Sequence, residues 1–256
     1  MSNLKFHILQ LDIAWESPKE NFKKIEPYLE KVKEGEILVL PETFATGFSM
    51  NPEAVKETME GSIVQWMKKA SKGRVICGSV FIEESQDVFN RFIWCEDGKV
   101  TYTYDKAHLF SLGNEDDYYV AGKQNVTIRY KGWNIRPFVC YDLRFPVWNR
   151  NVDDIDLYIY VANWPEVRRQ AWQSLLEARA IENQVYVVAS NCVGVDGTGV
   201  KTIGLSGVID YLGNWTVQEQ GEQTMVSTEV SKDELLEFRK SLPFLNDRDH
   251  FTIERS

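Results

Sequence analysis

Histidine and cysteine are scarce in this chain of 256 residues, which has three histidines and four cysteines. His108 is the only histidine outside the first strand-like segment and the C-terminal tail, so any imidazole-based site would depend on it. Three of the cysteines lie inside apolar, strand-like runs, which favours free buried thiols over disulfides. We therefore expect a reducing compartment, the cytoplasm, where a thiolate can persist.

Positive charge and long apolar stretches are also lacking. The chain has 29 Lys and Arg against 38 Asp and Glu, which gives a formal net charge of -9. This balance argues against binding to nucleic acid or to an anionic membrane surface, since both require a basic face. No segment approaches the length of a membrane span, and no basic region followed by an apolar core opens the chain. An anionic substrate would need a locally positive pocket.

Strand-like and helix-like patterns alternate along the whole chain, without a Pro/Gly/Ser-rich linker between them. We therefore predict a single α/β domain over residues 1–256, with 242–256 as a tail. Helices are predicted at 18–33, 61–71, 166–183 and 231–241 from apolar periodicity and capping signals. Strands are predicted at 4–12, 37–41, 74–82, 91–96, 100–104, 126–130, 135–139, 156–162 and 185–190, followed by three further β-type runs.

Three chemically complementary residues each follow a β-type run directly: Glu42, Lys106 and Cys140. Active sites of α/β sheets usually lie beyond the carboxyl ends of the strands. A thiol nucleophile needs a base, and the oxyanion that forms on an attacked carbonyl needs a positive or hydrogen-bonding partner. Each residue alone has an ordinary structural explanation, but their joint placement favours a thiol-dependent hydrolase.

Four blocks of this sequence resemble the nitrilase (carbon-nitrogen hydrolase) superfamily in order and spacing, over nearly the whole chain. They are LVLPET at 38–43, YDKAHLF at 104–110, VCYDLRFP at 139–146 and EARAIENQVY at 177–186. Within the superfamily the chain looks most like the bacterial ω-amidases, through FATGFSM at 44–50 and ANWP at 162–165. Those enzymes remove the terminal amide of 2-oxoglutaramate or 2-oxosuccinamate. The resemblance implies an αββα sandwich.

The resemblance also implies a role for each catalytic residue. Glu42 would be general base and acid, Lys106 the oxyanion stabiliser and Cys140 the nucleophile. Glu115 would be a second carboxylate, and the backbone N–H of Tyr141 would share the oxyanion with the lysine. An acyl thioester would form and be hydrolysed by water, so no metal or organic cofactor is expected. A homodimer is implied as well, through residues 141–151 and 166–183, with the tail a candidate for the same interface.

Arginines and large apolar side chains are candidates for substrate contacts. Arg168 or its neighbour Arg169 could receive a substrate carboxylate at the start of a helix. Asp142 and Arg144 are more simply explained as an ion pair that holds the turn after the nucleophile. Candidate wall residues of the pocket are Phe44, Phe48, Met50, Phe110 and Trp164.

Two other classes of function remain open from the sequence. A Cys-His protease or transferase would have to use His108, to which the resemblance gives a structural place after Lys106. A catalytically silent interaction protein would keep the fold without the chemistry. Among enzymes, the alternative substrates are an N-carbamoyl amine or another aliphatic amide, while a nitrile is less favoured.

Overall fold

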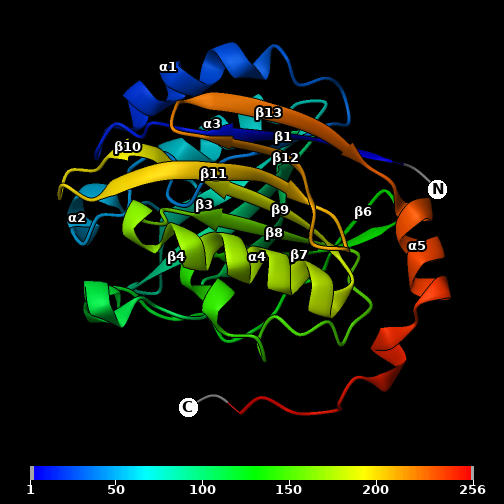
Figure 1. Ribbon diagram of the computed structural model, residues 1–256. Coiled ribbons are helices and arrows are strands. Elements are labelled where there is room, and N and C mark those ends of the chain that lie inside the picture. The colour runs from blue at the N-terminus through cyan, green and yellow to red at the C-terminus, as the bar shows by residue number, and fades with distance from the viewer. Residues whose placement is uncertain (1–2, 255–256) are drawn as a thin grey trace.

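The computed structural model describes residues 3–254 and contains two β-sheets stacked face to face between helices. Figure 1 shows α1 (Pro18–Leu29) and α3 (Ser62–Ala70) on the outer side of the first sheet and α4 (Arg169–Asn183) on the outer side of the second. The predicted αββα sandwich is confirmed. No helix within residues 3–254 is long and apolar enough to cross a membrane.

The first sheet has the strand order β13-β1-β2-β3-β4-β5. β1, β2 and β3 pair in parallel, whereas the β3–β4 and β4–β5 pairs are antiparallel. Because β5 is two antiparallel pairings away from β3, it runs in the same direction as β3 and β2. The carboxyl ends of β2 and β5 therefore lie at the same end of the sheet. The strands are β1 (Leu4–Gln10), β2 (Ile37–Val39), β3 (Val75–Glu84), β4 (Asp87–Glu96), β5 (Lys99–Asp105) and β13 (Thr224–Val230).

The second sheet has the order β10-β11-β9-β8-β7-β6, and β12 pairs with β11. β7, β8 and β9 are parallel, and every residue of β8 is buried because helices and the other sheet cover both of its faces. The strands are β6 (Ile128–Tyr130), β7 (Trp133–Val139), β8 (Leu157–Ala162), β9 (Tyr186–Asn191), β10 (Val193–Val195), β11 (Lys201–Ile209) and β12 (Trp215–Gln220).

The space between the sheets is filled by large apolar side chains from both of them. Phe6 and Trp94 of the first sheet belong to the same buried cluster as Phe138 and Tyr160 of the second. Phe138 stacks on Tyr160 with ring centroids 5.0 Å apart. Interiors of this kind are packed as densely as organic crystals. The ends of β2, β5, β7 and β8 are therefore held in fixed relative positions.

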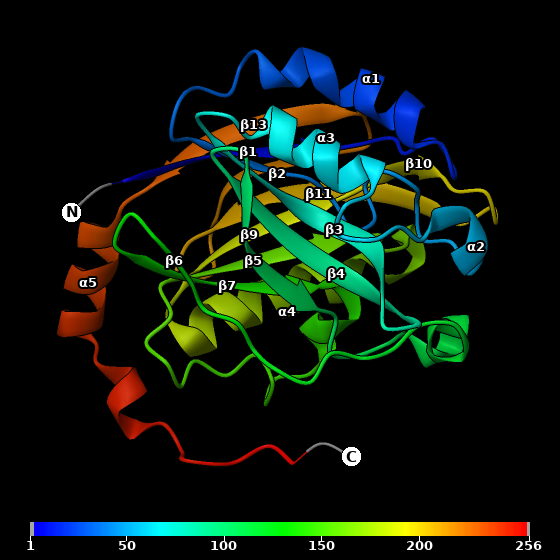
Figure 2. The ribbon, with the colours of Figure 1, turned by 180° about the vertical axis from the view of Figure 1, so that it is seen from behind.

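Differences from the predicted elements are confined to ends and short pieces. α1 ends four residues before the predicted end, and the side chain of Ser17 does not cap it. The four-residue helix α2 (Pro52–Val55) was not predicted. α5 (Lys232–Ser241) is capped by Ser231, as its sequence indicates. Figures 1 and 2 show that the chain after α5 turns and runs below the body of the molecule in both views.

Candidate active site

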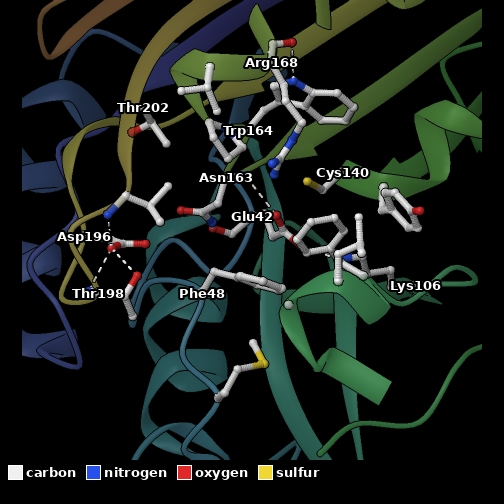
Figure 3. Close-up of a pocket in the computed structure, with 18 of the residues that line it drawn as sticks. Glu42, Phe48, Lys106, Cys140, Asn163, Trp164, Arg168, Asp196, Thr198 and Thr202 are labelled. Carbon is white, nitrogen blue, oxygen red and sulfur yellow. Dashed lines mark hydrogen bonds and ion pairs between the residues drawn. The ribbon is translucent and has the colours of Figure 1, made fainter. Parts of the chain in front are cut away.

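A cavity of about 420 Å³ opens beside the loops that follow the strands of both sheets. Small-molecule sites typically enclose about 300–1,000 Å³. All the predicted catalytic residues except Glu115 line the cavity, and so do most of the predicted substrate contacts. The lining includes Glu42, Phe48, Met50, Lys106, Phe110, Cys140, Tyr141, Arg144, Asn163, Trp164 and Arg168. Figure 3 shows Glu42, Lys106, Cys140 and Asn163 around this cavity.

Strand ends and sharp turns direct the three central side chains into this cavity. Lys106 follows β5 directly, and Glu42 follows β2 after two loop residues. Cys140 follows β7 and opens a 3-10 turn, Cys140–Arg144. The φ angle of Cys140 is 45°, in the left-handed region that non-glycine residues occupy only under constraint. Such residues cost of order 1–3 kcal/mol and concentrate at functional sites.

Lys106 lies between two buried carboxylates. Its Nζ is 2.9 Å from Oε1 of Glu42 and 2.9 Å from both carboxylate oxygens of Glu115. All three residues are at most 1% exposed. Glu115 belongs to a 3-10 turn, Glu115–Asp117, and its second oxygen accepts a hydrogen bond from the backbone N–H of Phe110 at 2.6 Å. Of the three acidic residues in this turn, Glu115 points inward, whereas Asp116 and Asp117 are exposed.

Two asparagines that the sequence analysis did not identify hold the carboxylates. Asn90, fully buried in β4, donates from Nδ2 to Oε1 of Glu42 at 2.8 Å and lies 3.5 Å from Oε1 of Glu115. Asn163 follows β8 and donates its backbone N–H to Oε2 of Glu42 at 2.8 Å. Its side-chain oxygen accepts from the Cys192 thiol at 2.9 Å. Both oxygens of Glu42 are therefore fixed in position.

The electrostatics of this cluster favour a charged lysine and a protonated thiol. Burial lowers the pKa of Lys106, but the charges of Glu115 and Glu42 outweigh it and raise that pKa well above its usual range. Burial raises the pKa of the Cys140 thiol, the charge of Glu42 raises it further, and Lys106 opposes both. Burial also raises the pKa of Glu115, against the effect of Lys106. A thiol in this state requires a base, and Glu42 is the adjacent carboxylate.

The turn after Cys140 is held by Asp142, but not through Arg144 as predicted. The carboxylate of Asp142 accepts hydrogen bonds from the backbone N–H of Val139, the hydroxyl of Tyr104, and the backbone N–H and ring Nδ1 of His108. The predicted Asp142–Arg144 ion pair is therefore wrong, and the carboxylate pairs with His108 instead. The imidazole of His108 is hydrogen-bonded to Asp142, in the turn that follows the nucleophile. This position agrees with the structural role that the family resemblance implies for His108.

Arginine and aromatic side chains form one wall of the cavity. The Arg144 guanidinium lies over the Trp164 ring, 4.8 Å from its centroid, and the Arg168 guanidinium lies 5.0 Å from the centroid of Phe110. Arg169, the other candidate for a substrate carboxylate, is exposed and lines a separate depression. The structure thus places Arg168 at the cavity and adds Arg144, which was not predicted there.

Phe44 does not reach the cavity. It is fully buried in the core outside the first sheet, where its ring lies 5.9 Å from that of Trp66. The preceding residue, Thr43, has a φ of 44°, and this turn sends the Phe44 side chain away from Glu42. The prediction that Phe44 lines the pocket is wrong, because a sequence pattern does not show on which side of such a turn the next side chain emerges.

The other cysteines are free and buried, which agrees with the sequence analysis. Burial raises the pKa of Cys95 and of Cys192 to about 12, and that of Cys77 well above its usual value. Cys140 alone among the four is partly accessible and lines the cavity. Within residues 3–254, no group of three or more His, Cys, Asp or Glu side chains is arranged to hold a metal ion.

A cysteine, a glutamate and a lysine meeting at the strand ends of an αββα sandwich define the arrangement expected of the nitrilase superfamily. The chain belongs to the carbon-nitrogen hydrolase family, whose model matches residues 8–240. The resemblance inferred from the four sequence blocks is confirmed, and with it the assignment of the chain as an enzyme.

Several relatives match along almost their full length. The chain is 40% identical to the omega-amidase YafV of Escherichia coli K12, over 99% of this chain and 100% of that protein. It is 36% identical to the 2-oxoglutaramate amidase of Bacillus subtilis, over 93% and 95%. A CN-hydrolase superfamily protein of Xanthomonas campestris, solved with an arsenic adduct in its active site, superposes with a TM-score of 0.95 at 40% identity, over 99% and 100%.

Proposed function

We propose that this protein is an ω-amidase that hydrolyses the terminal amide of a small 2-oxo acid, 2-oxoglutaramate or 2-oxosuccinamate, to the 2-oxo dicarboxylate and ammonia. The observation that carries the proposal is the cavity itself, where the Cys140 thiol meets the Glu42–Lys106 pair and faces a wall that holds Arg168. The relatives named as omega-amidase and 2-oxoglutaramate amidase support the choice of substrate.

The proposed chemistry follows from the positions of the charges. Glu42 takes the thiol proton as the Cys140 sulfur attacks the amide carbon, and the oxyanion is held by the Lys106 ammonium and the backbone N–H of Tyr141. The carbon–nitrogen bond breaks, and ammonia leaves with the proton that Glu42 returns. Water, deprotonated by the same carboxylate, then hydrolyses the thioester and frees the acid and the thiol. Glu115 and Asn90 keep the lysine and the base in place.

The proposed binding of the substrate places its carboxylate on Arg168, away from the amide. Lys106 is committed to Glu42, Glu115 and the reacting carbonyl, so a second cation has to meet the acid end. Arg168 is half-buried at the cavity, and its guanidinium lies over the Phe110 ring, 5.0 Å from the ring centroid. Because the ring does not accept the N–H donors of the fork as a carboxylate does, these donors can meet the acid end of the substrate.

An ammonia-release assay tests this proposal. We expect 2-oxoglutaramate or 2-oxosuccinamate to be cleaved with a kcat/KM at least about tenfold above that of a neutral amide of equal length, the equivalent of one charge-assisted contact. Equal values would leave another aliphatic amide or an N-carbamoyl amine as the substrate. No release from any amide would favour the silent interaction protein.

We also propose a cytoplasmic homodimer as the working form. Exposed apolar side chains support it, since they occur on the segment after the nucleophile (Val147, 55% exposed), on α4 (Ile181, 53%) and on the tail (Phe244, 59%). These three segments are the ones that the family resemblance implies for the interface, and association through them would remove this apolar surface from water. Light scattering at micromolar concentration should give twice the chain mass, and a mass near 29.6 kDa would contradict the dimer.

A further inference from the structure

Cys192 is a buried thiol that has no role in the proposed chemistry, yet its two nearest polar partners line the cavity. Its Sγ is 2.9 Å from Oδ1 of Asn163 and 3.4 Å from Oγ1 of Thr202. Cys192 follows β9 directly, and its backbone N–H donates to the oxygen of Ala162, the last residue of β8, at 3.3 Å. The pairing of two central strands thus sets this thiol behind the cavity wall.

The thiol of Cys192 acts as a hydrogen-bond donor. Burial raises its pKa to about 12, so the sulfur keeps its proton at neutral pH. The side-chain oxygen of Asn163 only accepts hydrogen bonds, and it therefore receives this proton. The other end of the same amide, Nδ2, donates to the backbone oxygen of Glu42 at 2.6 Å. If the amide turned over, two acceptor oxygens would face each other. Cys192 therefore fixes which way round the Asn163 amide lies.

The backbone N–H of Asn163 connects this amide to the reacting groups. It donates to Oε2 of Glu42 at 2.8 Å. Burial raises the pKa of the Cys140 thiol, and so does the charge of Glu42. Lys106 and a hydrogen bond with the backbone of Asn163 act in the opposite direction. Figure 3 shows Asn163 beside Glu42 and Cys140. One N–H group therefore supports both the base and the nucleophile, and its position depends on how Asn163 is held.

We propose that Cys192 is a positioning residue, whose thiol proton locks the Asn163 amide and thereby keeps the backbone N–H of that residue at the reacting groups. Cys192 does not line the cavity, so it acts through Asn163 and not on the substrate. This inference rests on the proposed function, in which Glu42 is the base and Cys140 the nucleophile. Loss of the thiol proton frees the amide to turn, and the N–H group then stabilises the thiolate less well.

The first test follows the alkylation of Cys140 by iodoacetamide from pH 7 to 9, and it needs no substrate. In Cys192→Ala we expect the rate at each pH to fall roughly 2- to 10-fold, because the pKa of the Cys140 thiol rises when the N–H group moves away. A site that had only become looser would be more accessible and would react faster. Cys192→Ser keeps a proton donor at the same place and should restore the rate to within about twofold.

Steady-state kinetics on 2-oxoglutaramate give a second readout. We expect Cys192→Ala to lower kcat roughly 3- to 10-fold and to keep KM within about twofold, since the lost contact supports the reacting groups. Cys95→Ala is the matched control, because it removes another buried thiol, in the core outside the first sheet, and should leave alkylation and kcat unchanged. Melting curves show whether each variant is folded. Cys192→Val, which removes the donor but fills the space, serves if the alanine variant is not.

The outcomes separate this inference from the proposed function. If iodoacetamide labels another cysteine first and Cys140→Ala keeps its turnover, the proposed nucleophile is wrong and this inference falls with it. If Cys140 is the nucleophile but Cys192→Ala keeps the alkylation rate and the kcat of the unsubstituted enzyme, only the role of Cys192 is wrong. Faster alkylation, a rise in KM alone, or a folded Cys192→Ser as slow as Cys192→Ala would mean that Cys192 acts through packing, and would also overturn the inference.

Discussion

The two sheets supply the site with different kinds of residue. The first sheet and its loops bring Glu42, Asn90 and Lys106, each at most 1% exposed and hydrogen-bonded to another member of the set. The second sheet brings Cys140 and, through the loop after β8, the wall that holds Arg168, both of them partly accessible from the cavity. Fixed electrostatics thus lie on one side of the cleft and contact with the substrate on the other.

Burial explains why the two sides have to differ. Removing one member of a buried ion pair typically costs 3–5 kcal/mol, because the charge left behind has no partner. A buried charge therefore needs a permanent partner, and Lys106 has two, the carboxylates of Glu42 and Glu115. The arginines remain half-buried and keep contact with water, so they can stay unpaired until a ligand arrives. Substitutions on the first sheet should therefore impair both folding and turnover, whereas those on the second should change chemistry or affinity with the fold intact.

The largest effect is expected on the second side, at the nucleophile. Cys140→Ala should lower kcat by on the order of 10⁴-fold or more while the protein keeps its melting temperature within a few degrees. In the unsubstituted enzyme, iodoacetamide should label Cys140 before Cys77, Cys95 and Cys192, because Cys140 alone among the four is partly accessible and lines the cavity. Peptide mapping that finds another cysteine labelled first would overturn the assignment.

The next effects concern the two opposite charges on the first side. Glu42→Gln should lower kcat by about 10²–10⁴-fold through loss of the base, and Lys106→Met by about 10²–10³-fold through loss of the oxyanion partner. Lys106→Met should also destabilise the fold, since it leaves Glu42 and Glu115 buried together. Turnover near that of the unsubstituted enzyme in either variant would remove one of the two proposed roles.

Alkylation of Cys140 should respond to the same two charges with opposite signs. The charge of Glu42 raises the pKa of the thiol and that of Lys106 lowers it. Glu42→Gln should therefore speed alkylation at fixed pH and Lys106→Met should slow it, by about tenfold for each unit of pKa change. In the unsubstituted enzyme the rate should keep rising from pH 7 to 9, because the thiol pKa lies above that window. Equal rates in all three proteins would contradict this account.

A smaller loss is expected where a neutral residue supports the charges. Asn90→Leu removes the hydrogen bond to Glu42 but keeps the branched shape of the side chain, and should lower kcat by roughly 10- to 100-fold without raising KM. Glu115→Gln should cost less than Glu42→Gln, since its proposed role is to position Lys106. Steady-state kinetics on the proposed substrate separate these cases. A rise in KM alone would mean that Asn90 acts on substrate binding.

The sequence was most informative where a rule of fold geometry applied. Glu42, Lys106 and Cys140 could be predicted because each follows a strand, and the carboxyl ends of these strands lie on the same side of the molecule. Asn90 could not be predicted, because it lies within a strand and nothing in its local sequence connects it to the site. It is brought beside the site by the pairing of its strand, in which its carbonyl accepts a hydrogen bond from the backbone N–H of Lys106 at 2.9 Å. This placement comes from tertiary pairing, which no local pattern records.

Arg144 was paired with the wrong carboxylate for a related reason. Asp142 is close to it in sequence and has the opposite charge, but both lie in a 3-10 turn, which has three residues per turn. Residues two apart therefore point in different directions around its axis. Asp142 faces His108 and the core, and Arg144 faces the cavity. Charge complementarity at short spacing predicts a contact only when the local helix type is known.

The smallest effect is expected behind the nucleophile, at His108. Its Nδ1 is 2.8 Å from the Asp142 carboxylate, and its ring stacks on Phe145 with centroids 3.7 Å apart. His108→Gln keeps a donor near Asp142 but loses the stacking, which should cost about 1–2 kcal/mol, a decrease of roughly 2–8 °C in Tm. Because Glu42 is the proposed base, kcat should fall by less than about tenfold. A folded variant with almost no turnover would instead make His108 the base and favour a Cys-His enzyme, and Asp142 would then be the residue that orients it.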